Sequence, residues 1–550
     1  MSFLDLYPSS SKDNISLLEQ TTLKRSEVID QIKSSRSTDI LVVGGGIHGS
    51  AFARLAAFNG FRVILLEKND FGNATSSRTS RMAHGGLRYL ENLDLKQVWE
   101  GIKAREDLYY SAPHLVKKSQ FFIPLRHHQR FFKLKIYAGL MLYNLMAGRY
   151  SELPEWININ KAHRHIRSLV SSDVVGGFIF YDGLMNDIRL VIENVIAARQ
   201  EGALCLNYAR VDHVSRGASD IVTVGWTDML TGKNYQTKAG VVINCSGPWV
   251  ASMGRIKPGS LKYSIRYSQG IHLVFNSKWQ GPSLLLPLKE HNRYYFVWPH
   301  RFGTLVGTTE RELHSPPDDP EPTREEIELL LERLNNDLPG SKLNRDTLYY
   351  AYAGVRTLPV RKTGKKVEHI SRRHAWTYND GVFSLVGGKF TTANWTVFDG
   401  LKTVVSLAGL GNIKISPLNQ RRLPGGGLPS SIDDFRQKCR EYSLREEIVE
   451  QAVARFGSRV RLLMDRKDNF KVIGDSLLAG EVRLAMATEQ VETIEDLLKR
   501  RLQLIEQPGH GLAIVDEIKE IFKEYKPDVD VEKQIEAYRN KISSLQSLLK

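Results

Sequence analysis

The chain has 550 residues, of which 42% are hydrophobic and 25% are charged. That length is more than a single hydrophobic core organises, and it predicts two or three domains. The composition excludes a disordered or fibrous protein and is typical of a globular one. The formal net charge of +15 favours anionic partners such as phosphorylated metabolites, acidic lipid or nucleic acid.

The three cysteines, Cys205, Cys245 and Cys439, are odd in number and lie far apart in the sequence. This spacing predicts neither a disulfide framework nor a cysteine zinc site, and it is typical of a reducing cytoplasm. The first residues lack the apolar core of a signal peptide, and no run approaches the ~18 apolar residues that a transmembrane helix requires. We therefore expect a cytoplasmic protein, either soluble or attached to a membrane only at its surface.

The strongest motif is a nucleotide-binding unit near the N-terminus. Ile40–Val43 form an apolar strand, and Gly44, Gly46 and Gly49 complete a G-x-G-x-x-G turn that opens a helix-like segment. These glycines permit the tight turn, the approach of a pyrophosphate and close packing of helix on strand, respectively. A second strand ends in Glu67, where a carboxylate can accept hydrogen bonds from a ribose. The unit predicts a site for FAD or NAD.

A second motif, ATSSRTSRMAHGGLRYLE, begins at Ala74 and combines hydroxyls, glycines and basic groups. Such a run suits phosphates or the edge of a flavin, although a solvated loop can have the same composition. With VVGGGIHGS and LLEKND upstream, it resembles the FAD-dependent glycerol-3-phosphate dehydrogenase family of the aerobic, quinone-linked type. The resemblance covers roughly residues 38–525.

Two segments that follow are expected to be helical or interfacial. Residues 92–112 predict a helix because apolar residues recur at helical spacing. The segment Phe121–Tyr150 mixes basic and apolar residues and is too short to span a bilayer. It predicts either an interfacial helix, with Phe131 and Phe132 at headgroup depth, or a core helix with a basic outer face.

Strands dominate the middle of the chain. The apolar strand Gly240–Asn244 ends in a small-residue turn that can return the backbone to the cofactor, and Ser264–Thr309 predicts a substrate-side sheet. Another apolar strand is followed by Gly387 and Gly388 and then by a helix. Backbone amides there can meet an isoalloxazine ring, while the helix N-terminus favours negative charge on a reduced flavin.

The C-terminal part is expected to be helical and to follow a glycine-rich linker, Pro424–Gly427. The sequences TREE at 323–326 and SLRE at 443–446 each predict a capping box at the start of a helix. The histidine pairs of the chain lack a nearby acid or cysteine, so we expect no metal site.

The predicted fold is α/β, with a FAD-binding Rossmann-like domain, an interleaved β-rich substrate domain and an all-α C-terminal domain. Residues 1–37 are expected to form an N-terminal extension with a short helix. Residues 38–424 would hold the FAD-binding domain, with substrate-binding parts at roughly 113–180 and 255–375. Residues 425–550 would form the helical domain.

The resemblance implies oxidation of sn-glycerol 3-phosphate to dihydroxyacetone phosphate, with hydride transfer to FAD and electrons passed to a membrane quinone. His272 is the candidate general base, because the unperturbed pKa of histidine lies near neutrality. Cations must hold the phosphate, and Arg can do so through two parallel hydrogen bonds. Glu310 stands where the family commonly has Asp. The expected catalytic residues are Arg88, His272, Glu310, Arg356 and Lys389, and those expected to bind substrate are Arg88, Tyr89, His272 and Arg356. The expected cofactor-binding residues are Gly44, Gly46, Gly49, Glu67, Thr75, Ser76, Ser77, His84, Gly85, Gly86, Ser246, Gly247, Gly387, Gly388, Lys389 and Thr391.

Other functions remain open at this point. An oxidase that passes electrons to oxygen would carry the same motifs, and a tRNA-modifying flavoprotein would suit the basic charge. Against the latter, the sequence has no RNA-binding signature, so we expect no nucleic-acid partner. The expected partners are the substrate, a quinone and an anionic membrane at the inner face of the cytoplasmic membrane, and a homodimer is compatible with the resemblance.

Overall fold

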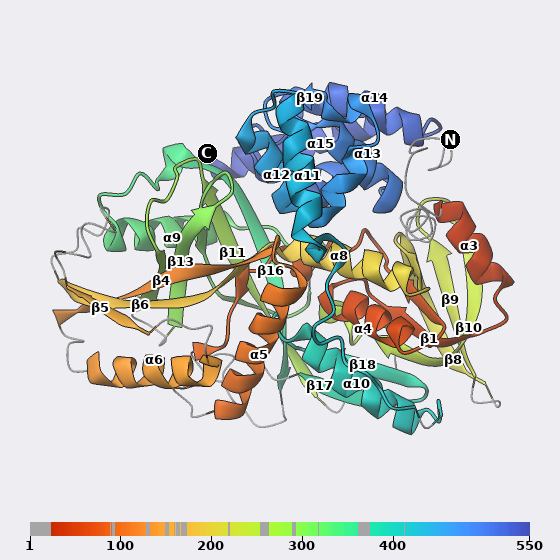
Figure 1. Ribbon diagram of the computed structural model, residues 1–550. Helices are drawn as coiled ribbons and strands as arrows, with labels where there is room; N and C mark the ends of the chain where they lie inside the picture. The colour runs from red at the N-terminus through yellow and green to blue at the C-terminus, as the bar shows by residue number, and fades with distance from the viewer. Residues whose placement is uncertain are drawn as a thin grey trace.

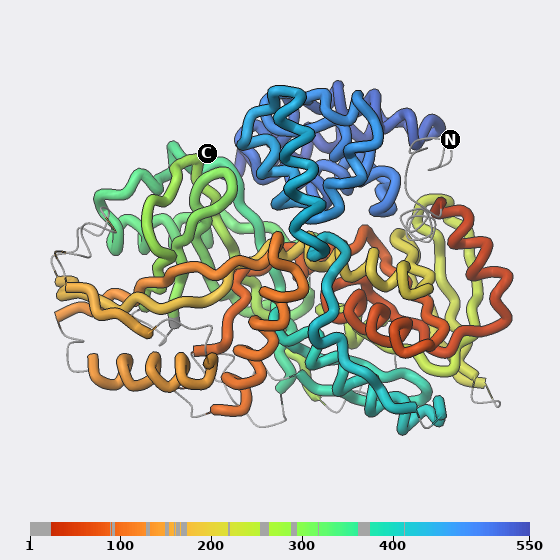
Figure 2. The backbone as a smooth tube through the Cα atoms, viewed as in Figure 1, coloured from red at the N-terminus to blue at the C-terminus, as the bar shows by residue number. Residues whose placement is uncertain are grey.

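The computed structural model describes residues 24–87, 90, 94–127, 133–148, 153–158, 160, 166, 173–217, 221–253, 263–288, 293–316, 318–360, 374–411 and 413–550. Two bodies, each built around a large sheet, lie side by side, and a helical body sits on top of both (Figure 1). Segments from the start, middle and later part of the chain lie together in the nucleotide-binding body on the right (Figure 2). The predicted fold class is confirmed.

The first sheet is built on parallel strands, which run in the order β18-β10-β1-β2-β7. An antiparallel strand, β17, closes one edge, and a hairpin of β8 and β9 pairs with the first half of β10. The strands are β1 (Thr38–Val43), β2 (Val63–Leu66), β7 (Leu204–Leu206), β8 (Ala209–Arg216), β9 (Val222–Asp228), β10 (Asn234–Asn244), β17 (Ala375–Asn379) and β18 (Val382–Val386). The predicted strand Gly240–Asn244 is the second half of the longer β10.

Both faces of this sheet are covered, which explains why β1 is a continuous apolar run. Ile40 and Val42 pack beneath three helices, α4 (Ile47–Phe58), α8 (Asp187–Gln200) and α10 (Ala393–Leu407). Leu41 and Val43, which alternate with them, face α3 (Arg25–Ser34) and the β8–β9 hairpin. The short helix expected in the N-terminal extension therefore exists and packs on the core.

The second sheet carries the substrate side. Its order is β15-β11-β14-β13-β12-β4-β6-β3, with β16 paired to β11 and β5 to β6. The strands are β3 (Met82–Ala83), β4 (Val116–Arg126), β5 (Glu155–Asn158), β6 (Val174–Met185), β11 (Ser264–Phe275), β12 (Ser283–Leu288), β13 (Arg293–His300), β14 (Gly303–Gly307), β15 (Arg311–Leu313) and β16 (Leu348–Val360). Helix α9 (Arg324–Asp337) packs on it and begins with the predicted capping box, in which Thr323 Oγ1 accepts from Glu326 N at 3.3 Å.

Two helices border the second sheet at the lower edge of the molecule. Helix α5 (Leu95–Ser111) matches the helix predicted for 92–112, and α6 (Lys133–Ala147) lies at the periphery (Figure 1). The structure corrects the expectation of one helical segment over Phe121–Tyr150. Its first six residues belong to β4, because they pair along their length with β6. No helix of the described ranges combines the length and apolar character needed to cross a bilayer.

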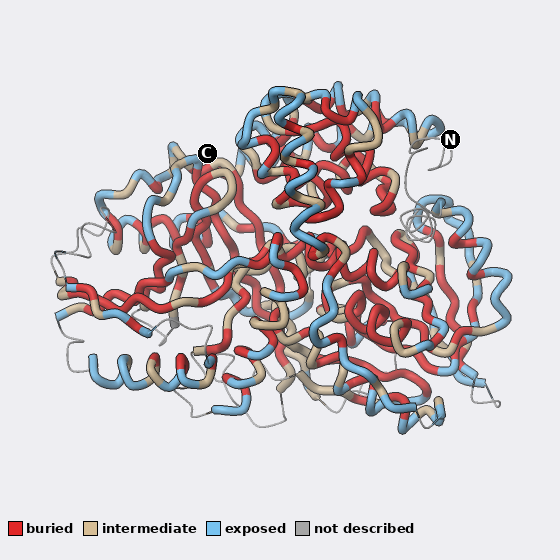
Figure 3. The backbone as a smooth tube through the Cα atoms, in the orientation of Figure 1, coloured by how far each residue is buried: buried red, intermediate tan, exposed pale blue. Residues whose placement is uncertain are grey.

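The helical body is formed by the chain beyond residue 424. Its helices are α11 (Pro429–Glu441), α12 (Glu446–Phe456), α13 (Ala479–Thr488), a π-helical turn (Asp496–Arg501), α14 (Val515–Tyr525) and α15 (Val531–Leu549). The predicted linker, Pro424–Gly427, packs against the nucleotide-binding body. Gly425 and Gly426 are buried, and Gly425 N donates to Glu193 Oε2 of α8 at 2.6 Å. One buried core includes Tyr350 and Tyr352 of the second sheet and continues into the helical body, whose interior is largely buried (Figure 3).

Candidate active site

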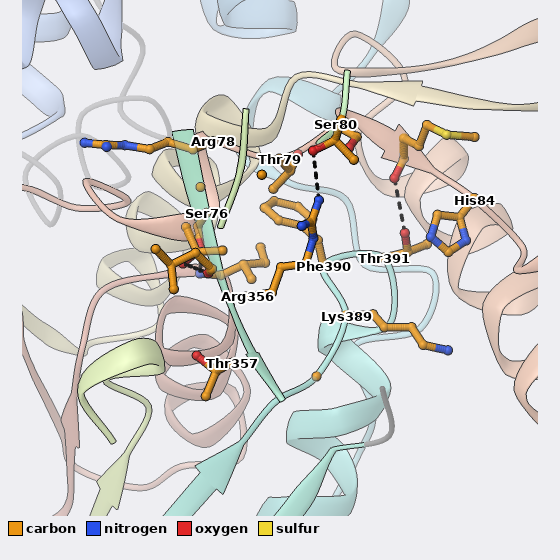
Figure 4. Close-up of a pocket in the computed structure, with 18 of the residues that line it drawn as sticks. Ser76, Arg78, Thr79, Ser80, His84, Arg356, Thr357, Lys389, Phe390 and Thr391 are labelled. Atoms are coloured by element: carbon orange, nitrogen blue, oxygen red, sulfur yellow. Dashed lines mark hydrogen bonds between the residues drawn. The ribbon is translucent and has the colours of Figure 1, made fainter. Parts of the chain in front are cut away.

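A cavity of about 1330 Å³ lies where the two sheets meet. It is lined by residues at the carboxyl ends of β1, β2, β10 and β18, and by side chains of β11 and β16. Ligands of open parallel sheets bind outside the carboxyl ends of the strands, so this is where the fold places a cofactor. Figure 4 shows the residues of its central part.

The first glycine turn has the local geometry that the motif requires. Gly44 has a φ of +101°, and a Cβ there would lie 2.6 Å from the carbonyl oxygen of Cys245. A Cβ on Gly49 would lie 1.8 Å from the carbonyl oxygen of Gly44, so helix α4 can pack on β1 only with glycine. Gly46 is the N-cap of α4 and lines the cavity. The N-terminus of α4 thus points at the cavity, as a pyrophosphate site requires.

Two side chains fix the edges of this turn. Glu67 lines the cavity at the end of β2 and accepts hydrogen bonds from Gly45 N at 2.6 Å and Asn69 N at 2.9 Å. Burial raises the pKa of Glu67, although both hydrogen bonds favour its ionised form. Ser76 Oγ accepts a hydrogen bond from Ile47 N at 3.0 Å. It thus satisfies one of the backbone amides at the start of α4 that have no partner within the helix.

The second glycine turn approaches the first from β18. Gly387 and Gly388 have φ of +76° and +102°, and a Cβ on Gly388 would lie 2.7 Å from His48 Nε2. Burial lowers the pKa of His48 to about 3, so this imidazole is neutral. His48 was not among the residues predicted from the sequence. It is the second residue of α4, at the end that faces the cofactor site, and its place in GGGIHGS could have indicated it.

His272 is buried in the middle of β11 and lines the cavity. Its Nε2 and the Oγ of Ser80 are joined by a hydrogen bond of 2.9 Å, and its ring stacks on Tyr352 with centroids 4.9 Å apart. Burial lowers the pKa of His272 well below its usual value, and the charges of Arg356 and Arg81 lower it further. The imidazole is therefore neutral, which is the protonation state of a base.

Arg356 lies on β16 beside His272. Its Nη2 donates to Thr308 Oγ1 at 3.0 Å. Its guanidinium lies over Gly270, where an added Cβ would be 2.7 Å from each of the two Nη atoms. Gly270 and His272 are two residues apart on one strand, so they face the same side of the sheet. The missing side chain at Gly270 lets the cation of Arg356 share that side with the imidazole.

The other predicted catalytic residues have different positions. Glu310 lines the rim of the cavity and accepts from Ser268 Oγ at 3.0 Å. Lys389 Nζ donates to Gln97 Oε1 of α5 at 2.6 Å, and its side chain extends away from Arg356 (Figure 4). Arg88 and Tyr89 lie outside the described residues.

The predicted cofactor residues divide into two groups. Most line the cavity, but Gly49 packs against Gly44, Ser77 Oγ donates to Ala74 O within its own turn, and Gly85 packs against Tyr143 of α6. The members that line the cavity are Gly44, Gly46, Glu67, Thr75, Ser76, His84, Gly86, Ser246, Gly247, Gly387, Gly388, Lys389 and Thr391. The parts of the chain that the structure describes hold no cluster of metal-ligating side chains.

Comparisons with known proteins agree with this geometry. Residues 39–396 match the family described as FAD dependent oxidoreductase. A glycerol-3-phosphate dehydrogenase of Pseudomonas aeruginosa is 32% identical over 487 residues, covering 85% of this chain and 91% of the relative. The corresponding enzyme of Synechocystis is 28% identical and covers 84% of this chain and 88% of its own length.

A solved structure shares the whole fold. The glycerol-3-phosphate dehydrogenase of Bacillus halodurans, complexed with FAD, superposes with a TM-score of 0.77 at 22% identity, covering 96% of this chain and 99% of that one. The chain belongs to the FAD-dependent oxidoreductases and, among them, to the glycerol-3-phosphate dehydrogenase family.

Proposed function

We propose that the protein oxidises sn-glycerol 3-phosphate to dihydroxyacetone phosphate and passes the electrons to a membrane quinone. The observation that carries the reaction is the placement of His272 and Arg356 on one side of the sheet, across Gly270, in a cavity that also holds both glycine turns. A neutral base beside a cation matches a substrate with one reacting hydroxyl and one phosphate. The names of the relatives support the same substrate.

The residues present fit FAD as the cofactor. Two glycine turns meet at the N-terminus of α4, where any Cβ at Gly44 or Gly388 would collide with its surroundings. The cavity of about 1330 Å³ exceeds the range of roughly 300–1,000 Å³ that serves a single small ligand. Glu67 would bind the ribose and the α4 N-terminus the pyrophosphate. When bound, FAD supplies the acceptor for the hydride from the substrate carbon.

The side chains of the second sheet supply the rest of the reaction. Arg356 binds the phosphate, and His272 removes the proton of the hydroxyl whose carbon is oxidised. The charge of Arg356 is one cause of the low pKa of His272. A phosphate bound to Arg356 offsets that charge, so the pKa of His272 rises and the imidazole becomes a stronger base. The phosphate therefore positions the substrate and also activates the base.

The direct test is the absorption spectrum of the purified protein. We expect a yellow protein whose flavin absorbance bleaches without oxygen when sn-glycerol 3-phosphate is added, with dihydroxyacetone phosphate as product. A protein that stays yellow with this substrate would contradict the proposed reaction. A colourless protein that regains no flavin on incubation with FAD would contradict the cofactor.

The shape of the cavity supports a quinone as electron acceptor. The cavity extends from His272 to helix α6 along an apolar wall formed by Ile123, Leu125, Ile136, Leu140, Leu285 and Phe296. On the outer side of α6, Leu134 and Leu145 are 75% and 79% exposed. The helix that borders the cavity thus also exposes apolar side chains. Figure 3 shows that much of α6 is exposed at the edge of the molecule.

This arrangement supports attachment of the protein to the inner face of the cytoplasmic membrane through α6. Exposed leucines enter the headgroup region, and basic residues such as Lys133 and Lys135 add attraction to anionic lipid. The oxidase alternative is separated from the quinone reaction by its product. An oxidase forms stoichiometric peroxide without quinone, whereas we expect turnover in air to stay slow until a quinone is added.

A further inference from the structure

The turn Thr79–Ser80–Arg81 joins three bodies of the molecule at the active site. Thr79 Oγ1 donates to Asp187 Oδ2 of α8 at 2.8 Å, and Ser80 Oγ is hydrogen-bonded to His272 Nε2 at 2.9 Å. Arg81 Nη1 donates to Glu506 Oε2 of the helical body at 2.9 Å. Three consecutive residues thus contact the nucleotide-binding body, the base and the helical body, in that order.

His272 depends on this turn for its orientation. Its Nδ1 has no hydrogen-bond partner within the described ranges, and Ser80 is the one side chain of those ranges bonded to the imidazole. The ring also stacks on Tyr352, whose hydroxyl donates to Thr79 O at 2.8 Å, and it lies over Gly307 of β14. The hydrogen bond and the aromatic stack of the imidazole therefore both lead back to the same turn.

The turn needs an external support. Arg81 has a φ of +55°, which is unfavourable for a residue with a Cβ, and its N–H donates to Thr79 Oγ1 at 2.9 Å. Glu506 accepts from two nitrogens of the Arg81 guanidinium, and both side chains are about nine-tenths buried. His300 completes the cluster, with Nε2 at 3.2 Å from Glu506 Oε2. A bidentate buried pair of this kind fixes geometry strongly.

We propose that Ser80 positions the imidazole of His272 and that Glu506 of the helical body, acting through Arg81, holds Ser80 in place. The helical body is then a part of the catalytic apparatus, although it contributes no residue to the cavity lining. This proposal rests on the proposed function, because it takes His272 as the base that removes the substrate proton.

The test measures flavin reduction by sn-glycerol 3-phosphate in single-turnover, oxygen-free experiments. Ser80→Ala should lower the rate at saturating substrate by roughly 10- to 100-fold, since a base displaced by about 1 Å loses that much, while the apparent Kd for substrate stays close to wild type. Ser80→Thr, which keeps the hydroxyl, should recover most of the rate. Glu506→Gln should lose rate by a similar factor with FAD still bound.

A matched control is available at the same interface. Glu489 is also a buried carboxylate of the helical body, and it is paired with Arg189 at 2.6 Å, Arg459 at 2.7 Å and Arg501 at 3.8 Å. It forms no hydrogen bond or ion pair with the described residues of the 79–81 turn. Glu489→Gln should keep the wild-type rate of flavin reduction in folded protein. A rate loss in Glu489→Gln equal to that in Glu506→Gln would show a general effect of weakened domain contact and overturn the proposal.

A double-mutant cycle separates action through Ser80 from independent effects. If Glu506 acts through Ser80, the variant with both Ser80→Ala and Glu506→Gln should be no slower than the slower single variant, whereas multiplied losses would overturn the proposal. If Glu506→Gln does not fold, Glu506→Asp replaces it under the same criteria. Unchanged rates in Ser80→Ala, with normal reduction of the wild type, would contradict this proposal alone. Failure of the wild type to be reduced would contradict the proposed function.

Discussion

The guanidinium of Arg356 lies over Gly270 and lines the cavity. We expect its charge to act on the phosphate of the substrate and not on the reacting carbon. We predict that Arg356→Ala raises the apparent KM for sn-glycerol 3-phosphate by about 30- to 900-fold, which corresponds to roughly 2 to 4 kcal/mol for one sheltered charged hydrogen-bond partner. The KM for glycerol, which has no phosphate, should change little, and FAD should remain bound. Steady-state kinetics with both alcohols measures the difference.

A matched arginine provides the control for that substitution. Arg266 lies on the neighbouring strand β11, is not among the cavity-lining residues, and pairs loosely with Glu312 at 3.6 Å. Arg266→Ala should leave both KM values unchanged. Equal proportional losses for glycerol and its phosphate in Arg356→Ala would place phosphate recognition on another residue.

Gly46 is the residue at which the cofactor and the backbone should come closest. A Cβ there would already lie 2.9 Å from Ser76 Oγ, and the two methyl groups of valine would extend further into the cavity. We predict that Gly46→Val gives a folded protein without flavin. The measurement is the ratio of flavin absorbance to protein after purification with added FAD. A ratio that stays at one FAD per chain would contradict the cofactor geometry.

Helix α6 is the element on which the membrane proposal depends. Phe131 and Phe132, which the sequence suggests as membrane anchors, lie outside the described residues, whereas Leu134 and Leu145 are exposed on α6. We predict that Leu134→Ser with Leu145→Ser lowers binding to anionic liposomes by at least ~10-fold, since burying one leucine is worth roughly 1.5 to 3 kcal/mol. Flavin reduction by sn-glycerol 3-phosphate should be unaffected, but quinone reduction in vesicles should fall.

Salt and a second pair of leucines control this experiment. Raised salt should weaken liposome binding without abolishing it, because only the basic residues are screened. Leu407 and Leu428 are 55% and 72% exposed on other elements, so serine at both positions should leave binding intact. Co-sedimentation of the α6 variant at the wild-type level would exclude α6 as the membrane contact.

Local signals in the sequence predicted one of the two expected helix starts correctly and the other wrongly. The box at Thr323 caps α9, but Ser443 does not cap α12. Ser443 instead ends α11 with a φ of +52°, where Ser443 N donates to Arg440 O and Leu444 N to Cys439 O. These two hydrogen bonds form a Schellman motif at the end of α11. Ser443 is part of that motif and so does not start α12, although the SLRE pattern predicts that it does. The strand β4 was missed for a different reason, because the strand that pairs with it, β6, begins only at Val174.

The catalytic cluster shows the same limit over longer distances. The glycine turns and Glu67 were recognisable because strand, turn, helix and acid follow one another within one unit. Ser80 meets His272 across 192 positions, and Arg81 meets Glu506 across 425. Neither pattern nor spacing within either segment indicates such a partner, so these contacts needed the three-dimensional fold.

Buried histidines should make the folded protein sensitive to mild acid. Burial lowers the pKa of His48 and of His114 to about 3, and that of His272 well below its usual value. Between about pH 6.5 and 5 the unfolded chain binds these protons and the folded protein does not, so stability is lost as the pH falls. Each such group contributes up to about 1.4 kcal/mol per pH unit.

Thermal unfolding of the FAD-bound protein measures this effect. The Tm should fall between pH 6.5 and 5, before the carboxylates with lowered pKa values, such as Glu489 at about 2, lose their ion pairs on protonation in stronger acid. A Tm that stays constant down to pH 5 would show that these imidazoles take up protons in the folded state.

The measurement that tests the proposed reaction most directly is oxygen-free stopped-flow reduction of the bound flavin by sn-glycerol 3-phosphate, unlabelled and deuterated at C2. Removal of hydride from C2 predicts bleaching with both substrates and a slower rate with the C2-deuterated one, while deuterium at C1 has no comparable effect. A flavin that remains oxidised, or a rate that is slowed by deuterium at C1 and not at C2, would contradict oxidation to dihydroxyacetone phosphate.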